Sequence, residues 1–112
     1  MIDPLAKIDK PASTDALFKA LSDGTRRALL EQLVRDGEQS VHALTALSGV
    51  SQPMVSRHLA KLQRAGLVTV RRVGRETWYT PRAKGLAPVV QWMAVYGALW
   101  SQRFTALEGI ED

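Results

Sequence analysis

The chain contains no cysteine among its 112 residues. This absence excludes disulfides, thiolate metal sites, thiol redox sensing and cysteine nucleophiles. Aromatic residues make up only 6% of the chain, and no apolar run approaches the roughly 20 residues that a membrane-spanning helix needs. Residues 1–12 lack the apolar core of a signal peptide, so we expect a flexible N-terminal arm and a cytoplasmic protein without a membrane partner.

Residue types that carry catalysis or bind metals are sparse and scattered. The two histidines, His42 and His58, fall in different predicted helices, and neither has a nearby cysteine or a His, Asp or Glu three or four residues further on. The acidic residues show no paired spacing suited to acid–base catalysis, and Ser51 and Ser56 have no evident base. We therefore expect no enzyme, no cofactor and no metal site. His58 lies beside the apolar line of its helix, which it is expected to support.

The charge is concentrated in one part of the chain. The whole chain carries a formal net charge of +4, but residues 57–84 hold eight basic residues and a single acid, Glu76. A basic block in an otherwise slightly acidic domain is typical of a protein that binds a polyanion. A basic surface that is merely solvated is the alternative, and charge alone does not separate DNA from RNA or anionic lipid.

Hydrophobic periodicity predicts four short helices within one domain over residues 13–112. The predicted helices cover residues 14–22, the segment from Thr25 to Asp36, the segment from Ser40 or Val41 to Gly49, and residues 51–65. Ser51 is a good N-cap for the last of these, and Gly66 is a typical residue just past a helix end.

After Gly66 the period changes to nearly two, which predicts strands at 67–73 and 77–80 around a turn at 73–76. Helical periodicity returns over about residues 86–107. This order predicts a mainly α winged helix-turn-helix: four short helices, a two-stranded β-hairpin wing and a long C-terminal helix.

The predicted helix 51–65 has an apolar face and an opposite face that is polar, slim and basic. Such a helix fits a DNA major groove, where its amino-terminal side chains reach base edges and its later ones reach phosphates. A glycine turn with a protruding arginine, here Arg75, suits a narrow minor groove. Arg71 and Arg72 point to opposite faces of their strand, so only one of them can face phosphate well. The candidate DNA-binding residues are Gln52, Pro53, Ser56, Arg57, Lys61, Arg64, Arg72 and Arg75.

The last predicted helix carries more large apolar side chains than a chain of this size can bury alone. Aromatic residues on a terminal amphipathic helix are typical of a homodimer interface. The candidate dimer residues are Leu17, Trp92, Met93, Tyr96, Leu99, Trp100 and Phe104. Part of this apolar surface can also pack on the chain's own helix 14–22 while the rest forms the dimer interface. Two alternatives stay open: a regulator gated by a small molecule bound near Trp92 and Trp100, and a winged helix that binds another protein.

Three segments resemble the ArsR/SmtB-type winged-helix repressors of bacteria. They are residues 21–30 (LSDGTRRALL), 51–68 (SQPMVSRHLAKLQRAGLV) and 71–79 (RRVGRETWY). The Ser-x-His-Leu step from Ser56 to Leu59, followed by Leu-x-x-Ala-Gly-Leu-Val, is the most specific part of the resemblance, which covers about residues 14–107. The aromatic last helix is similar to the SdpR-like branch, which lacks metal sites.

The resemblance implies a homodimeric transcriptional repressor of an imperfect palindrome in double-stranded DNA, often controlling its own operon. It also implies base contacts by Gln52, Ser56 and Arg57 and a wing contact by Arg75. The chain departs from metal-sensing members because its segment 40–47 has no cysteine and its last helix has no histidine. No effector of the family carries over to this sequence.

Overall fold

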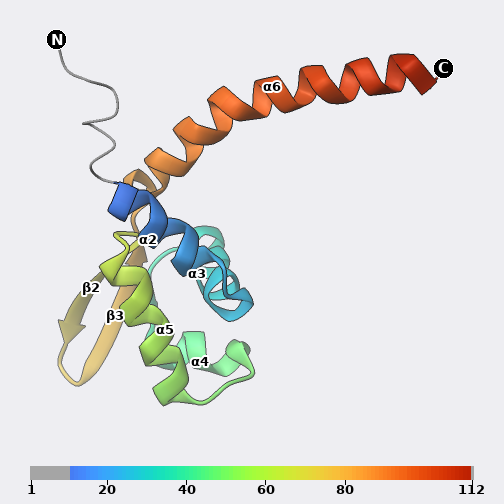
Figure 1. Ribbon diagram of the computed structural model, residues 1–112. Coiled ribbons are helices and arrows are strands. Elements are labelled where there is room, and N and C mark those ends of the chain that lie inside the picture. Colours follow the sequence, from blue (N-terminus) through green and yellow to red (C-terminus); the bar gives the residue numbers. More distant parts are fainter. Residues whose placement is uncertain (1–10, 112) are drawn as a thin grey trace, which may run out of the picture.

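The computed structural model of the chain describes the backbone of residues 11–111 and the burial of the side chains of residues 14–108. Residues 1–10 of the expected N-terminal arm lie outside the described residues. The prediction was wrong for Pro11 and Ala12, because these two residues form the start of α2. The elements in chain order are α2 (Pro11–Leu21), α3 (Gly24–Asp36), β1 (Gln39–Ser40), α4 (Val41–Ser48), α5 (Gln52–Arg64), β2 (Val68–Val73), β3 (Glu76–Pro81), the 3-10 helix η1 (Ala83–Leu86) and α6 (Ala87–Glu111). Figure 1 shows this arrangement and confirms the predicted order of short helices, hairpin and long helix.

Three helices begin at side-chain caps. The hydroxyls of Ser40 and Ser51 accept hydrogen bonds from the amides three residues on, at 3.1 and 3.4 Å, at the starts of α4 and α5. The carboxylate of Asp23 accepts from the Arg26 amide at 3.0 Å. Asp23 therefore starts α3 at Gly24, one residue before Thr25, where the sequence pattern predicted the boundary. These caps satisfy amides that have no helical partner.

The hairpin belongs to a three-stranded antiparallel sheet with the order β1-β3-β2. The prediction of a two-stranded wing was incomplete, because the two-residue strand β1 pairs with β3 through Gln39↔Tyr79 and Ser40↔Trp78. β2 and β3 pair from Val68↔Pro81 to Val73↔Glu76. Gly74, with φ of 61°, forms the turn between them. β1 thereby joins the middle of β3 to the start of α4, while the hairpin tip extends away from the helices (Figure 1).

The core lies where α3, α4 and α5 meet. Its most deeply buried side chains are Leu29, Leu33, Leu44, Val55, Leu59, Leu62 and Leu67. From α2, Leu17 joins this core with only 2% of its surface exposed. The expectation that Leu17 lies at a dimer interface therefore needs correction, since its side chain already packs inside its own chain and leaves little surface for a partner.

A buried arginine joins three helices at one end of this core. Arg26 is 8% exposed, and its guanidinium donates to the carbonyls of Ala20 at 2.7 Å and Lys19 at 3.1 Å. Its third nitrogen lies 3.3 Å from His58 Nδ1 on α5. A positive group at the carboxyl end of α2 complements the helix dipole. His58 is buried, so it supports α5 from inside, as the sequence predicted.

Helix α6 leaves the body of the molecule and projects into solvent (Figure 1). The radius of gyration is 17.8 Å, whereas a compact chain of this length would have about 13 Å. Only the root of α6 packs on the chain, through buried Val89 and an edge-to-face contact between Trp92 and Phe18 of α2 at 5.9 Å. Among the described residues, nothing else covers the remainder of this long helix.

Candidate nucleic-acid interface

Helices α4 and α5 form a helix-turn-helix. The turn between them runs from Gly49, whose φ of 74° ends α4 in the left-handed region, to the N-cap Ser51. A side chain at Gly49 would be strained in that conformation. The Ser48 hydroxyl also accepts from the Val50 amide at 3.1 Å, which holds the turn. α5 is thus set at a defined angle with its amino end at the surface (Figure 1).

Helix α5 divides cleanly into two faces. Val55, His58, Leu59 and Leu62 are buried. All six predicted DNA-binding side chains of this helix are exposed, namely Gln52, Pro53, Ser56, Arg57, Lys61 and Arg64. The Arg57 guanidinium lies 3.7 Å from the Met54 sulfur, on the surface near the amino end. The exposed face carries three positive charges and is free of acids, so it presents hydrogen-bond donors suited to base edges and phosphates.

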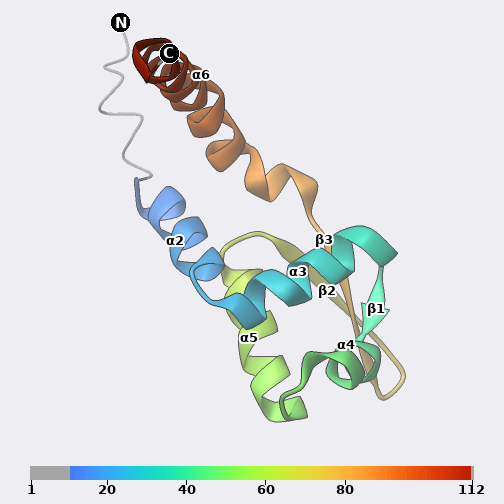
Figure 2. The same ribbon diagram turned by 90° about the vertical axis from the view of Figure 1, so that its right-hand side faces the viewer.

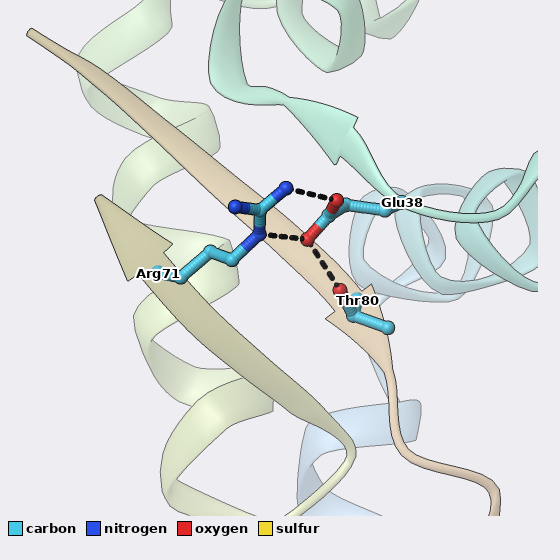
Figure 3. A network of polar contacts seen from close by, with 3 residues as sticks. All are labelled: Glu38, Arg71 and Thr80. Atoms are coloured by element: carbon cyan, nitrogen blue, oxygen red, sulfur yellow. Dashed lines mark hydrogen bonds and ion pairs between the residues drawn. The ribbon is translucent and has the colours of Figure 1, made fainter. Parts of the chain in front are cut away.

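The wing tip places further arginines at the surface. Arg72, Val73, Gly74 and Arg75 are all exposed at the end of the hairpin. Arg71 behaves differently, because a carboxylate holds it. Its Nε and a terminal nitrogen donate to the two oxygens of Glu38 at 2.6 and 2.7 Å, and the Thr80 hydroxyl donates to the same carboxylate at 2.9 Å (Figure 3).

This network of Glu38, Arg71 and Thr80 ties both wing strands to the segment before β1. The Arg71 guanidinium and the Thr80 hydroxyl lower the pKa of the Glu38 carboxyl to about 2. Sequence reasoning missed this contact, since Glu38 and Arg71 are far apart in the chain. Its consequence is that Arg72 and Arg75, rather than Arg71, are the wing arginines without a carboxylate partner among the described side chains.

Replacing Glu38 with glutamine tests this network. When folding lowers the pKa of a carboxyl, the charged group stabilises the fold at pH values above its ordinary, unfolded-state pKa. This stabilisation is lost as the pH falls toward and through the pKa of the folded state. For Glu38 that window runs from about 4.5 down to about 2. We expect Glu38→Gln to lower the Tm at neutral pH and to flatten its decline across that window, measured by thermal melting. Glu31→Gln, at an exposed position on α3, should leave the pH profile unchanged.

The projecting helix α6 carries the second candidate surface. Six predicted dimer residues, Trp92, Met93, Tyr96, Leu99, Trp100 and Phe104, are each about half exposed. The rings of Trp92 and Tyr96 lie 4.9 Å apart, and those of Trp100 and Phe104 lie 5.7 Å apart. So large an apolar surface on one helix is unusual for a monomer and is typical of an interface.

The alternative of a small-molecule pocket near this helix finds little support in its shape. The depression nearest to Trp100, of about 660 Å³, is lined by Tyr96, Leu99, Trp100, Arg103, Ala106 and Leu107, all from α6. One face of a single helix does not enclose a ligand as binding pockets do.

Comparison with known proteins agrees with this geometry. Residues 21–71 match a family model described as a helix-turn-helix domain. The chain is 36% identical over 91 residues to a probable mercury resistance operon repressor of Streptomyces lividans, covering 79% of this chain and 72% of that protein. It is 31% identical over 77 residues to the transcriptional repressor SdpR of Bacillus subtilis, covering 69% and 84%.

A third relative is the arsenic resistance transcriptional regulator ArsR1 of Pseudomonas putida, 43% identical over 63 residues. The match covers 56% of this chain but only 49% of that protein.

Solved structures agree with the sequence relatives. An ArsR-like transcriptional regulator from Rhodococcus superposes with a TM-score of 0.70 at 34% identity, covering 91% of this chain and 95% of that one. A homodimeric winged helix-turn-helix DNA-binding domain from Mycobacterium bovis, a possible ArsR-family regulator, superposes with a TM-score of 0.65 at 26% identity, covering 88% of each chain. These matches confirm the winged helix-turn-helix fold.

Two of these relatives are named for resistance to arsenic and mercury. The residues of this chain do not fit a thiolate metal site, because the sequence has no cysteine. Within residues 11–111, no group of three or more His, Cys, Asp or Glu side chains is placed to hold a metal ion. Metal independence stays a prediction.

Over the part of the chain that the structure describes, no helix combines the length and apolarity needed to cross a bilayer. The relatives are transcriptional regulators, which confirms the prediction of a regulator rather than an enzyme. From the match to these relatives and the shared fold, the chain belongs to the ArsR family of winged helix-turn-helix transcriptional regulators.

Proposed function

We propose that this regulator is a homodimeric repressor that binds an imperfect palindrome in double-stranded DNA. The observation that carries the proposal is the exposed, acid-free basic face of α5 beside an exposed wing tip. A helix of this width enters the major groove, and the wing then reaches the adjacent backbone or minor groove.

The side chains of this surface have different roles in the proposal. Gln52, Ser56 and Arg57 lie at the amino half of α5, so they read base edges, with Pro53 beside them against a thymine methyl. Lys61 and Arg64 lie further along the helix and contact phosphates. At the wing, Arg75 enters the minor groove and Arg72 contacts the backbone.

The dimer in this proposal forms through α6. The aromatic residues of α6 are half exposed in the single chain. A second copy of the chain, related by two-fold symmetry, would bury them against its own α6. The Mycobacterium bovis homodimer has the same fold, which supports this assembly. Two α5 helices would then enter successive major grooves about 34 Å apart.

Such a dimer represses by occupying a promoter, and its own operon is the first target to test. Because it acts on the chromosome, we place it in the cytoplasm. The domain division follows the same reasoning: we assign residues 13–112 to the DNA-binding domain, with its dimerisation helix at about 86–107. We assign it no cofactor and no effector.

Selection from a pool of random duplexes tests the proposal. We expect the purified protein to enrich two inverted half-sites whose centres lie about 10 base pairs apart. The enriched sequence should also occur upstream of the protein's own gene if it controls its own operon. Enrichment of a single half-site, or of no sequence at all, would contradict the dimeric operator model.

A further inference from the structure

A basic cavity lies apart from the base-reading end of α5. It has a volume of about 320 Å³ and lies between the carboxyl end of α2 and the carboxyl half of α5. Figures 1 and 2 both place these two helix ends side by side. Four basic side chains line it, Lys19 from α2, Arg26 from α3, and Lys61 and Arg64 from α5. Lys61 is nine residues from Gln52, so the cavity is about 14 Å from the amino end of the helix.

None of the lining residues is an acid, although the Asp23 carboxylate at the start of α3 lies near Arg26 and offsets part of its charge. Among the described side chains, the only ion pair is the one between Arg71 and Glu38, on the other side of the sheet. The remaining lining residues are alanines, whose short side chains leave the space open. Four positive charges around a concave surface create a potential that attracts an anion.

Neighbouring backbone groups do not compete strongly for these cations. At the carboxyl end of α5, the carbonyls of Lys61, Leu62 and Gln63 already accept hydrogen bonds from the amides of residues 65–67. Arg26 donates to the carbonyls of Lys19 and Ala20 at the end of α2. It therefore contributes mainly its buried charge, while the exposed Lys19, Lys61 and Arg64 can donate to a ligand directly.

We propose that this cavity is an oxyanion site that takes a phosphate group, supplied either by the DNA backbone or by a free anion. The first source rests on the proposed DNA-binding function, whereas the second does not. Arginine and lysine at this spacing suit phosphate because they combine charge with several N–H donors.

An anion held here would join two parts of the proposed mechanism. It would bridge α5, the recognition helix, to α2, which touches the root of α6 through Phe18 and Trp92. Occupancy would therefore hold the recognition helix in place relative to the dimer helix.

Thermal melting without DNA tests the site directly. The probe is sodium phosphate, titrated against sodium chloride at constant ionic strength. We expect a saturable rise in Tm of about 5 °C when phosphate is about tenfold above its dissociation constant. Lys19→Gln should remove most of this rise, and Lys61→Gln serves if Lys19→Gln does not fold. Arg35→Gln on α3 removes the same charge outside the cavity and should keep the rise.

DNA binding distinguishes the two sources. If a backbone phosphate occupies the site, Lys19→Gln should lower the slope of log affinity against log salt by about 2 for a dimer, and Arg35→Gln should not. A saturable rise in Tm with phosphate, together with an unchanged salt slope of DNA binding in Lys19→Gln, identifies a free anion as the ligand. A linear rise in Tm shared by all variants, with unchanged salt slopes, would reflect the general stabilising effect of phosphate and would overturn the proposal. The melting experiment contains no DNA, so its outcome is independent of the proposed operator binding.

Discussion

Replacing Trp100 with alanine is expected to weaken the dimer about a thousandfold. Trp100 is 60% exposed in the single chain and lies against Phe104, in the middle of the projecting part of α6. Truncating a central aromatic residue of an interface costs about 2 kcal/mol or more. Each subunit of the two-fold dimer carries the substitution, so the total loss of dimerisation free energy is about 4 kcal/mol. This corresponds to a thousandfold weaker dimer. Sedimentation velocity over a concentration series measures it, and operator affinity should fall in parallel.

Val34→Ala provides a matched control for this prediction. Val34 lies on α3 and is 62% exposed, so the change removes a similarly exposed apolar side chain away from α6. The variant should sediment as the wild type does. A wild-type protein that is monomeric at micromolar concentration, or a Trp100→Ala variant that dimerises normally, would contradict the assignment of α6 as the dimer interface.

Replacing Arg57 with alanine is expected to reduce the preference for operator over random DNA by roughly 100-fold. Arg57 is exposed in the amino half of α5, within the surface that we assign to base contacts. One arginine–base pair is worth about 1–3 kcal/mol of discrimination, so about tenfold per half-site multiplies over two half-sites. Competition binding with operator and scrambled duplexes measures this ratio.

Lys61→Ala is the companion variant on the same helix face. Because phosphate contacts carry little sequence information, it should weaken binding to both duplexes by similar factors and reduce the salt dependence. Equal losses on both duplexes for Arg57→Ala as well would show that the division between base-reading and phosphate-binding residues on α5 is wrong.

Local signals in the sequence were sufficient for most of the fold. The cap at Ser51, the glycine after α5 and the apolar spacing of Val55, Leu59 and Leu62 act within a few residues of each other. These features predicted the helix-turn-helix and the exposure of its basic face. The change of period after Gly66 predicted the hairpin for the same reason.

Contacts between distant residues were not predictable in this way. A two-residue strand such as β1 has no periodicity of its own and forms only because β3 offers it a paired edge. The ion pair of Glu38 with Arg71 and the burial of Arg26 against His58 both depend on how separate elements pack. Leu17 and Trp92 belong to similar apolar stripes, yet packing buries the first and leaves the second half exposed.

Fluorescence anisotropy of the purified protein at about 150 mM salt tests operator binding most directly. It compares the affinity for a specific duplex with the affinity for a scrambled duplex of equal length. The specific duplex is either the one upstream of the protein's own gene or the one obtained by selection. We expect about a thousandfold preference for the specific duplex, as is typical of a sequence-reading protein. Equal and weak binding to all of the duplexes would mean that α5 and the wing supply only phosphate affinity, and it would contradict the operator-binding function.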